Sequence, residues 1–267
     1  MILCNFVAML TKTEAIVLRS IKYGESKIIV DMFTRLHGRL SFVVSMPKTS
    51  HGRLKKQYFQ PLTLLLLDCD VRPQASLQKL REAQLLTPLP SLSSVPEKLA
   101  IALFIAEFLY YALRGEQQNE PLFDYVERSL EWLDGCEAHY ANFHLVFLMH
   151  LSRFLGFYPN LEDSGERRKD SGERREDRGE RRENTFYFDL RAGAFCEAAP
   201  LHRDYLLPQE AAMVRLMMRM DYPTMHLFRL SRAQRNRCVE VALLFYRLHL
   251  PDFPEMRSLE ILKTLWG

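Results

Sequence analysis

The first third of the chain contains about five short β-type runs that lie too close together for helices to fit between them. The runs are rich in β-branched residues or alternate in polarity, and they fall at residues 15–18, 27–33, 39–44, 58–67 and 77–83. Turn signals such as Tyr23-Gly24 and His37-Gly38 separate them. Because helical crossovers have no room here, the spacing predicts a small antiparallel barrel.

Beyond Pro88 the pattern changes to apolar helices, predicted at about 94–114, 120–133, 140–154, 208–220, 231–248 and 258–265. The first of these helices is apolar on all sides, which is typical of a helix buried in a helical core. The predicted fold class is therefore α+β. Residues 1–85 form a five-stranded antiparallel barrel of the oligonucleotide-binding (OB) fold, and residues 86–267 form a mainly α-helical domain.

A charged repeat interrupts the helical half. Three consecutive heptads, DSGERRK, DSGERRE and DRGERRE, occupy residues 163–183 and hold eight acids, eight bases and no apolar residue. Such a segment cannot bury a core, so we expect a low-complexity surface insertion over 162–184. Its arginines are balanced by neighbouring acids, which makes a role in DNA binding a minor alternative.

The charge of the chain is unevenly distributed. The formal net charge is only +3, but residues 1–85 hold thirteen Lys and Arg against six Asp and Glu. No acid occurs from Met32 to Leu67, where the cations are interleaved with the aromatic residues Phe33, Phe42, Tyr58 and Phe59. Single-stranded nucleic acid is bound by such a combination of cations for phosphates and flat rings for bases. The predicted DNA-binding residues are Arg35, Arg39, Lys48, Arg53, Lys55, Lys56 and Tyr58.

A plainer interpretation is that these aromatic residues belong to the core and that the cations only solubilise the surface. The complete absence of acids over 36 residues favours binding. A second basic cluster, Arg229, Arg232, Arg235 and Arg237, flanks the start of the helix after Ser231. It could contact DNA or receive an acidic peptide tail, with a solvated helix face as an equal alternative, and we predict partner binding for Arg229, Arg232 and Arg235.

Catalytic patterns are weak. Asp68 and Asp70 have the spacing of a metal-binding pair on a strand, but no third acid, lysine or histidine accompanies them. His139, His144 and His150 do not superpose on one helical face, and phosphate-binding and nucleophile-elbow motifs are absent from the sequence. We predict a protein that is not an enzyme; a metal nuclease using the two aspartates is the alternative.

Compartment signals indicate a cytoplasmic protein. The five cysteines are scattered and odd in number, as expected of reduced thiols. The apolar start at residues 1–8 lacks a basic region and a cleavage site, so we interpret it as a lead into the first strand or as an extension before a true start at Met9. The longest apolar stretch, 99–113, contains Glu107 and is too short to span a membrane.

Six segments in order resemble the RecO recombination and repair family of bacteria. They are EAIVLRS and YGES within residues 14–26, FTRLHGRLS at 33–41, QPL at 60–62, RFLGFYP at 153–159, YRLHL at 246–250, and SLEILK at 258–263. The resemblance covers about residues 10–160 and 185–265, and the heptad repeat lies outside the family pattern.

The resemblance implies an OB barrel, a helical domain and a protein that anneals complementary DNA strands. It also implies that the protein works with RecR, helps RecA to displace single-strand-binding protein, and receives the acidic, apolar C-terminal tail of that protein on its helical domain. Many family members carry a four-cysteine zinc site. Here Cys196 keeps the opening of that motif but no second thiol follows, so we predict no zinc and no cofactor.

The leading hypothesis is therefore a recombination mediator of the nucleoid that binds single- and double-stranded DNA and anneals single strands without a catalytic site. Its rival is a non-catalytic adaptor whose basic surface receives acidic protein tails. A comparison of the affinities for bare oligonucleotide and for an acidic C-terminal peptide would separate the two.

Overall fold

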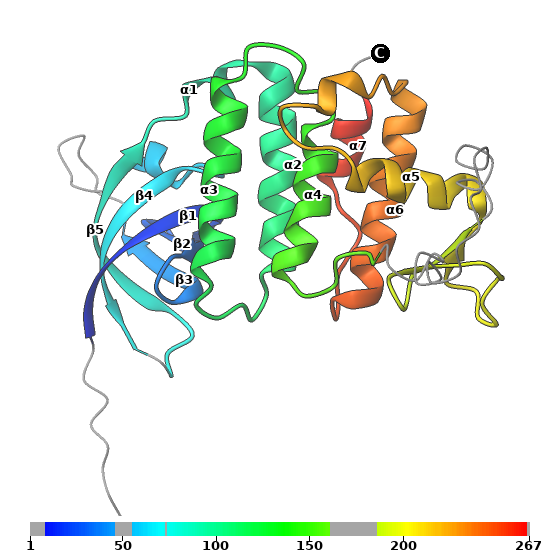
Figure 1. Ribbon diagram of the computed structural model, residues 1–267. Helices are drawn as coiled ribbons and strands as arrows, with labels where there is room; N and C mark the ends of the chain where they lie inside the picture. The colour runs from blue at the N-terminus through cyan, green and yellow to red at the C-terminus, as the bar shows by residue number, and fades with distance from the viewer. Residues whose placement is uncertain (1–8, 46–54, 73, 161–185, 266–267) are drawn as a thin grey trace, which may run out of the picture. The chain divides into compact units, whose positions relative to one another are not determined.

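The computed structural model describes residues 9–45, 55–72, 74–160 and 186–265 (Figure 1). The described chain forms two compact units. The first contains the residues up to Glu137 together with Glu255–Leu265, and the second contains Ala138–Pro254. The domain boundary between residues 85 and 86 stays a prediction. The heptad repeat and the apolar N-terminal residues 1–8 lie outside the described residues.

The first unit begins with the closed five-stranded barrel that the sequence predicted. Its strands are β1 (Met9–Tyr23), β2 (Lys27–Thr34), β3 (Gly38–Ser45), β4 (Leu64–Val71) and β5 (Gln78–Thr87), arranged in the order β1-β2-β3-β5-β4. Alternate residues point inward, so that Val30 and Met32 of β2 meet Phe42 and Val44 of β3 in a core closed to solvent.

The barrel is mixed rather than purely antiparallel, which corrects the prediction. Residues Phe42 and Val43 of β3 pair in parallel with Gln78 and Lys79 of β5. The reason is topological: five strands closed into a ring cannot alternate in direction all the way round, so at least one neighbouring pair must be parallel. The remaining four pairings are antiparallel.

The segment expected to start the fourth strand forms a turn of 3-10 helix instead, η1 (Lys56–Phe59). Pro61 follows it and Leu62 has a positive φ of 62°, which is incompatible with a regular strand. The strand therefore begins only at Leu64. The side chain of Phe59 is 3% exposed and joins the barrel core, so the helical turn contributes an apolar residue to the barrel interior.

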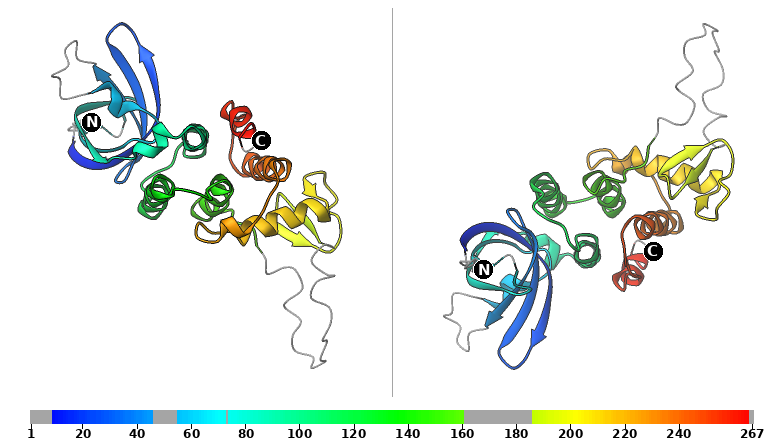
Figure 2. Two further views of the ribbon diagram at one scale, coloured as in Figure 1. Left: turned by 90° about the horizontal axis from the view of Figure 1, so that it is seen from above. Right: turned by 90° about the horizontal axis from the view of Figure 1, so that it is seen from below.

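Four helices complete the first unit: α1 (Pro90–Ser94), α2 (Pro96–Ala112), α3 (Glu120–Gly135) and α7 (Ser258–Lys263). The long helix α2 packs against β1, α1 and α7, which explains why it is apolar on most of its circumference. Phe33 of β2 and Phe123 of α3 are both fully buried, with ring centroids 5.5 Å apart. Figure 2 shows the barrel beside α2 and α3.

The second unit is mainly helical, with α4 (Phe143–Phe154), α5 (Pro208–Met218), η2 (Met225–Leu227) and α6 (Arg232–His249). A capping box between Ser231 and Gln234 starts α6 at the position the sequence predicted. A small sheet of β6 (Tyr187–Asp189), β7 (Ala194–Cys196) and β8 (Tyr205–Leu206) has the order β7-β6-β8. In the part of the chain that is described, no helix has the length and apolarity needed to cross a membrane.

Gly38 is the point of closest approach between the barrel and the helices of the first unit. Its φ is +67°, and a Cβ placed there would lie 2.2 Å from the carbonyl oxygen of Glu116. The amide N–H of Arg39 donates to the same carbonyl at 3.1 Å. Only glycine combines this backbone conformation with this approach, so the turn fixes where the barrel meets the loop before α3.

We expect Gly38→Ala to destabilise the protein by about 3 kcal/mol, because a positive φ and a backbone clash are added together. Gly24→Ala is the matched control, since Gly24 has a φ of +71° but nothing within 4 Å of the added Cβ. Its expected cost is only about 1 kcal/mol. Urea unfolding of the two variants measures the difference; equal losses would contradict the role given to the close approach.

Candidate nucleic-acid interface

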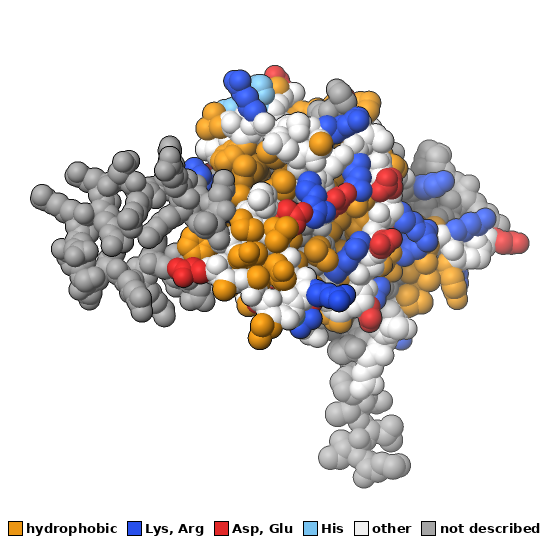
Figure 3. Space-filling view, turned by 90° about the vertical axis from the view of Figure 1, so that its right-hand side faces the viewer, with side chains coloured by type: hydrophobic (Ala, Val, Ile, Leu, Met, Phe, Trp, Pro, Cys, Tyr) orange, Lys and Arg blue, Asp and Glu red, His pale blue; other side chains and the backbone are white. Residues whose placement is uncertain are grey.

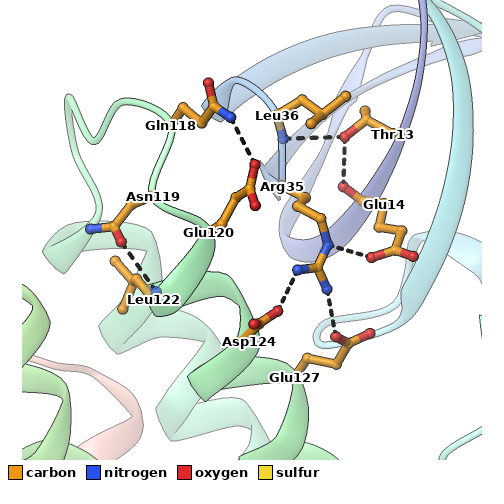
Figure 4. A network of polar contacts seen from close by, with 10 residues as sticks. All are labelled: Thr13, Glu14, Arg35, Leu36, Gln118, Asn119, Glu120, Leu122, Asp124 and Glu127. Atoms are coloured by element: carbon orange, nitrogen blue, oxygen red, sulfur yellow. Dashed lines mark hydrogen bonds and ion pairs between the residues drawn. The ribbon is translucent and has the colours of Figure 1, made fainter.

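Arg35 is held inside the first unit by three carboxylates (Figure 4). Its Nε donates to Glu14 of β1 at 2.5 Å and its Nη2 to Glu127 of α3 at 2.8 Å, while Nη1 donates to Asp124 of α3. The guanidinium also lies 4.4 Å from the ring centroid of Phe123. We call this arrangement the Arg35 clasp; it joins the barrel to α3.

Each nitrogen of the Arg35 guanidinium already donates to a carboxylate of the clasp. Burial alone would lower the pKa of Arg35, but its hydrogen bonds with Asp124 and Glu14 outweigh this and raise the pKa. Burial raises the pKa of Glu127, and the attraction of Arg35 counteracts that rise. A phosphate would have to displace three anions to reach this guanidinium, so we do not propose Arg35 as a DNA contact.

Arg39 is also engaged within the first unit. Its guanidinium lies 4.1 Å from the ring centroid of Tyr110 on α2, and its Nη1 donates to the Tyr110 carbonyl at 2.5 Å. A carboxylate oxygen of Asp31 lies 3.7 Å from Nη2. Since only 13% of its side chain is exposed, Arg39 supports the contact between barrel and helix, and we leave it out of the proposed interface as well.

The other predicted DNA-binding residues have different positions. Lys48 and Arg53 lie outside the described residues. Lys55 and Lys56 are exposed at the start of η1, and the ammonium of Lys55 lies 5.8 Å from the ring centroid of Tyr58. Tyr58 itself is half-buried and packs against the barrel core. The two lysines therefore offer exposed positive charge to a phosphate, while the DNA contact of Tyr58 stays a prediction.

The long β1–β2 hairpin presents an exposed strand face that the sequence analysis missed. The outward side chains are Arg19, Ile21 and Tyr23 of β1, Lys27 and Ile29 of β2, and Val43 of β3. The register places Ile21, Ile29 and Val43 side by side and Tyr23 opposite Lys27. Ile21 is 39% exposed and Tyr23 is 52% exposed. We call these six residues the hairpin face.

The hairpin face combines apolar and aromatic side chains with unopposed cations. In the described part of the chain no carboxylate pairs with Arg19 or Lys27 of this face, nor with Lys22, which lies on the other side of β1 opposite Ile28. Asp31 lies opposite Arg19 in the register, but it is 7% exposed and accepts a hydrogen bond from the Ser41 hydroxyl. The exposed Glu25 lies in the turn between the two strands and forms no ion pair among the described residues. The outer face of strands 2 and 3 is where OB folds bind oligonucleotides, and the hairpin face includes it.

A signal in the sequence could have revealed this face. Residues Arg19, Ile21 and Tyr23 occupy every second position, and Lys22 lies between the last two. This alternation continues β1 beyond Leu18, where the predicted strand ended, as far as the turn expected at Tyr23-Gly24. The strand in fact runs on to Tyr23.

The second predicted cluster does not form one surface. Arg235 of α6 is 8% exposed; its Nε donates to Asn142 Oδ1 and its Nη2 to the carbonyl of Leu230, both at 3.0 Å. Burial lowers the pKa of this guanidinium. Arg237 pairs with Glu210 and Glu240. Arg229 and Arg232 are exposed. Arg235 thus has a structural position, and its predicted partner contact would require a rearrangement.

The residues considered for catalysis also have structural neighbours. Asp70, near the end of β4, is 7% exposed and accepts from Arg81 at 2.7 Å. His144 is fully buried in α4, and burial, assisted by the nearby charge of Arg235, lowers its pKa to about 3. Among the described residues, no three His, Cys, Asp or Glu side chains gather in a group suited to a metal ion.

Comparison with known proteins identifies similar sequences along nearly the whole chain. The family model described as Recombination protein O N terminal matches residues 9–89, and the one described as Recombination protein O C terminal matches residues 93–259. A DNA repair protein RecO from Phocaeicola vulgatus is 46% identical over 259 residues, which is 97% of this chain and all of the relative. Proteins of that name from Bacteroides fragilis and Porphyromonas gingivalis are 46% and 32% identical, with the same coverage.

We expect Arg35→Ala to destabilise the protein by roughly 2 kcal/mol, because it removes charge-assisted hydrogen bonds and leaves three carboxylates facing one another. The matched control is Arg191→Ala, which removes an ion pair with Asp204 whose two side chains are both partly exposed, and it should shift the denaturation midpoint much less. Urea denaturation at low and moderate salt measures both. A larger loss for the control would show that the clasp is not a major link.

Proposed function

This chain belongs to the RecO family of DNA repair proteins, and we propose that it binds single-stranded DNA on its barrel and anneals complementary strands. The observation that carries the proposal is the hairpin face, where Tyr23 and Ile21 are exposed beside unopposed cations. Flat and apolar side chains accept stacked bases of any sequence, and cations follow the phosphates. Lys55 and Lys56 extend the basic character of the barrel surface.

Annealing follows from charge neutralisation. Two complementary strands repel each other through their phosphates, and cations at the barrel surface reduce that repulsion while the bases stay unpaired. Such a process needs positioning and electrostatics but no bond to be broken, so we propose that the protein acts without a catalytic site. Double-stranded DNA offers phosphates but no unstacked bases, so we expect it to bind more weakly than single strands.

Support for protein partners comes from the second unit. Its exposed large apolar residues include Leu201, Leu207 and Leu227, and Figure 3, which views the side of α5 and α6, shows apolar side chains with Lys and Arg, and some Asp and Glu, among them. Exposed apolar surface bordered by cations suits an acidic tail with an apolar end. We propose that this unit receives the C-terminal tail of single-strand-binding protein through Arg229 and Arg232, and that the protein acts with RecR to load RecA in the cytoplasm, at the nucleoid.

Salt dependence tests the DNA-binding proposal. If three to five phosphates are contacted, log K for a single strand should fall with log salt at a slope of roughly −2 to −3.5. Arg19→Glu combined with Lys27→Glu should weaken binding of every sequence and reduce the slope, whereas Tyr23→Leu should weaken binding roughly fivefold or more through lost stacking and leave the slope unchanged.

Arg128→Glu is the matched control for charge, because Arg128 is an exposed arginine of α3 in the same unit and lies outside the hairpin face. It should change affinity little. Fluorescence anisotropy with a labelled oligonucleotide measures all four proteins. Affinity that does not depend on salt, or that the hairpin variants leave unchanged, would refute binding at this face.

The tail proposal has a separate test. Arg229→Glu combined with Arg232→Glu should abolish binding of an acidic peptide with an apolar C-terminus and leave oligonucleotide affinity unaltered. Arg219→Glu is the control, since Arg219 is an exposed arginine at the end of α5 in the same unit. Calorimetric titration with the peptide shows the outcome; full peptide binding by the double variant would move the tail to another surface.

A further inference from the structure

A pocket of about 510 Å³ lies within the first unit, where the barrel meets α2 and the start of α7. Its apolar lining residues are Leu18, Pro61, Leu103 and Ala106. Its cationic and aromatic lining residues are Arg19, Tyr110, Tyr111 and Arg257, and we call these four the rim. We propose that this pocket binds one unpaired nucleotide of a DNA strand that continues from the hairpin face. The volume lies in the range of roughly 300–1,000 Å³ that is usual for small-molecule sites.

The rim of the pocket offers stacking surfaces. The guanidinium of Arg19 lies 4.9 Å from the ring centroid of Tyr110, and the Tyr111 ring meets Tyr110 edge-on at 5.0 Å and 79°. Unpaired bases stack on aromatic rings and on the planes of guanidinium groups. Since Arg19 is exposed and flexible in its reach, a base can take its place on Tyr110 while the guanidinium turns to the phosphate.

The charge of the pocket suits a phosphate. The side chains of Arg19 and Arg257 pair with no carboxylate of the described chain. Glu107 is the one acid among the lining residues, and it is already occupied at the start of α7. It accepts from the amides of Arg257 at 3.1 Å and Ser258 at 2.8 Å, and from the Ser258 hydroxyl. Its charge therefore opposes an incoming phosphate less than a free carboxylate would.

The position of Arg19 favours a nucleic acid over a peptide. Arg19 belongs both to the hairpin face and to the pocket rim, so one strand can cross the face and reach the pocket without leaving the surface of this unit. The pocket also brings α7 into the binding site, since Arg257 lies 238 positions after Arg19 in the sequence. The helical part of the unit would thus hold the strand directly instead of only supporting the barrel.

This inference rests on the proposed function, and photocrosslinking separates the two. The full chain is mixed with oligonucleotides that carry a single 5-iodouracil at successive positions, irradiated, and digested with trypsin. We expect crosslinks both in the peptide of residues 23–27, which contains Tyr23, and in the peptide of residues 99–114, which contains Tyr110 and Tyr111.

A charge reversal supplies an independent measurement. Arg257→Glu alters a side chain on the pocket rim and leaves the backbone bond to Glu107 possible, so the fold should persist. We expect oligonucleotide affinity to fall roughly tenfold and the salt slope to decrease by about 0.7, as for one lost phosphate contact. Arg128→Glu again serves as the matched control, and an unchanged thermal midpoint verifies folding.

The outcomes are distinct. Crosslinks confined to residues 23–27 together with an unaltered affinity of Arg257→Glu would overturn the nucleotide pocket and leave the hairpin face in place. Binding of an acidic peptide that is lost in Arg257→Glu, without crosslinks to residues 99–114, would make the pocket a peptide site and overturn the inference. Failure of the chain to bind oligonucleotide at all would remove the proposed function itself.

Discussion

The attachment of the barrel to α2 and α3 is the constraint on which the rest of the first unit depends. Phe33 and Phe123 bury their rings against each other, Arg35 adds three ion pairs beside them, and Gly38 lets two backbones come into direct contact. Aromatic packing, charge-assisted hydrogen bonds and a backbone approach without a Cβ act within a few residues of each other. Three different kinds of contact therefore attach the barrel to the helices of this unit.

This attachment also decides which cations remain available for a ligand. The strand ends nearest the helices carry Arg35 and Arg39. Both guanidinium groups already interact with carboxylates, a carbonyl or aromatic rings within the unit. Toward the β1–β2 turn, Arg19 and Lys27 on the same face pair with no carboxylate of the described residues, and Tyr23 stays exposed. A single sheet face thus divides into a structural part and an exposed part.

The sequence was informative wherever local pattern and burial agree. Strand alternation predicted the barrel, and the apolar circumference of α2 and the cap at Ser231 predicted helices close to their observed limits. It was wrong at Tyr58, where an apolar run looked like a strand but a 3-10 turn inserts Phe59 into the barrel interior. The direction of the β3–β5 pairing depends on ring closure, which no local window contains.

The candidate binding residues also differ in whether the sequence or only the tertiary structure identifies them. The sequence alone determined that the first third of the chain is basic and that aromatic residues lie among its cations, and the order of its residues pointed to a family of DNA repair proteins. Only the tertiary structure decided which of those cations face solvent. The sequence around Arg35 does not show whether its partner is a phosphate or the carboxylates of Asp124 and Glu127, which lie about ninety positions away. An ion pair depends on the distance between two side chains in space, and residue order along the chain does not show which distant residues come together.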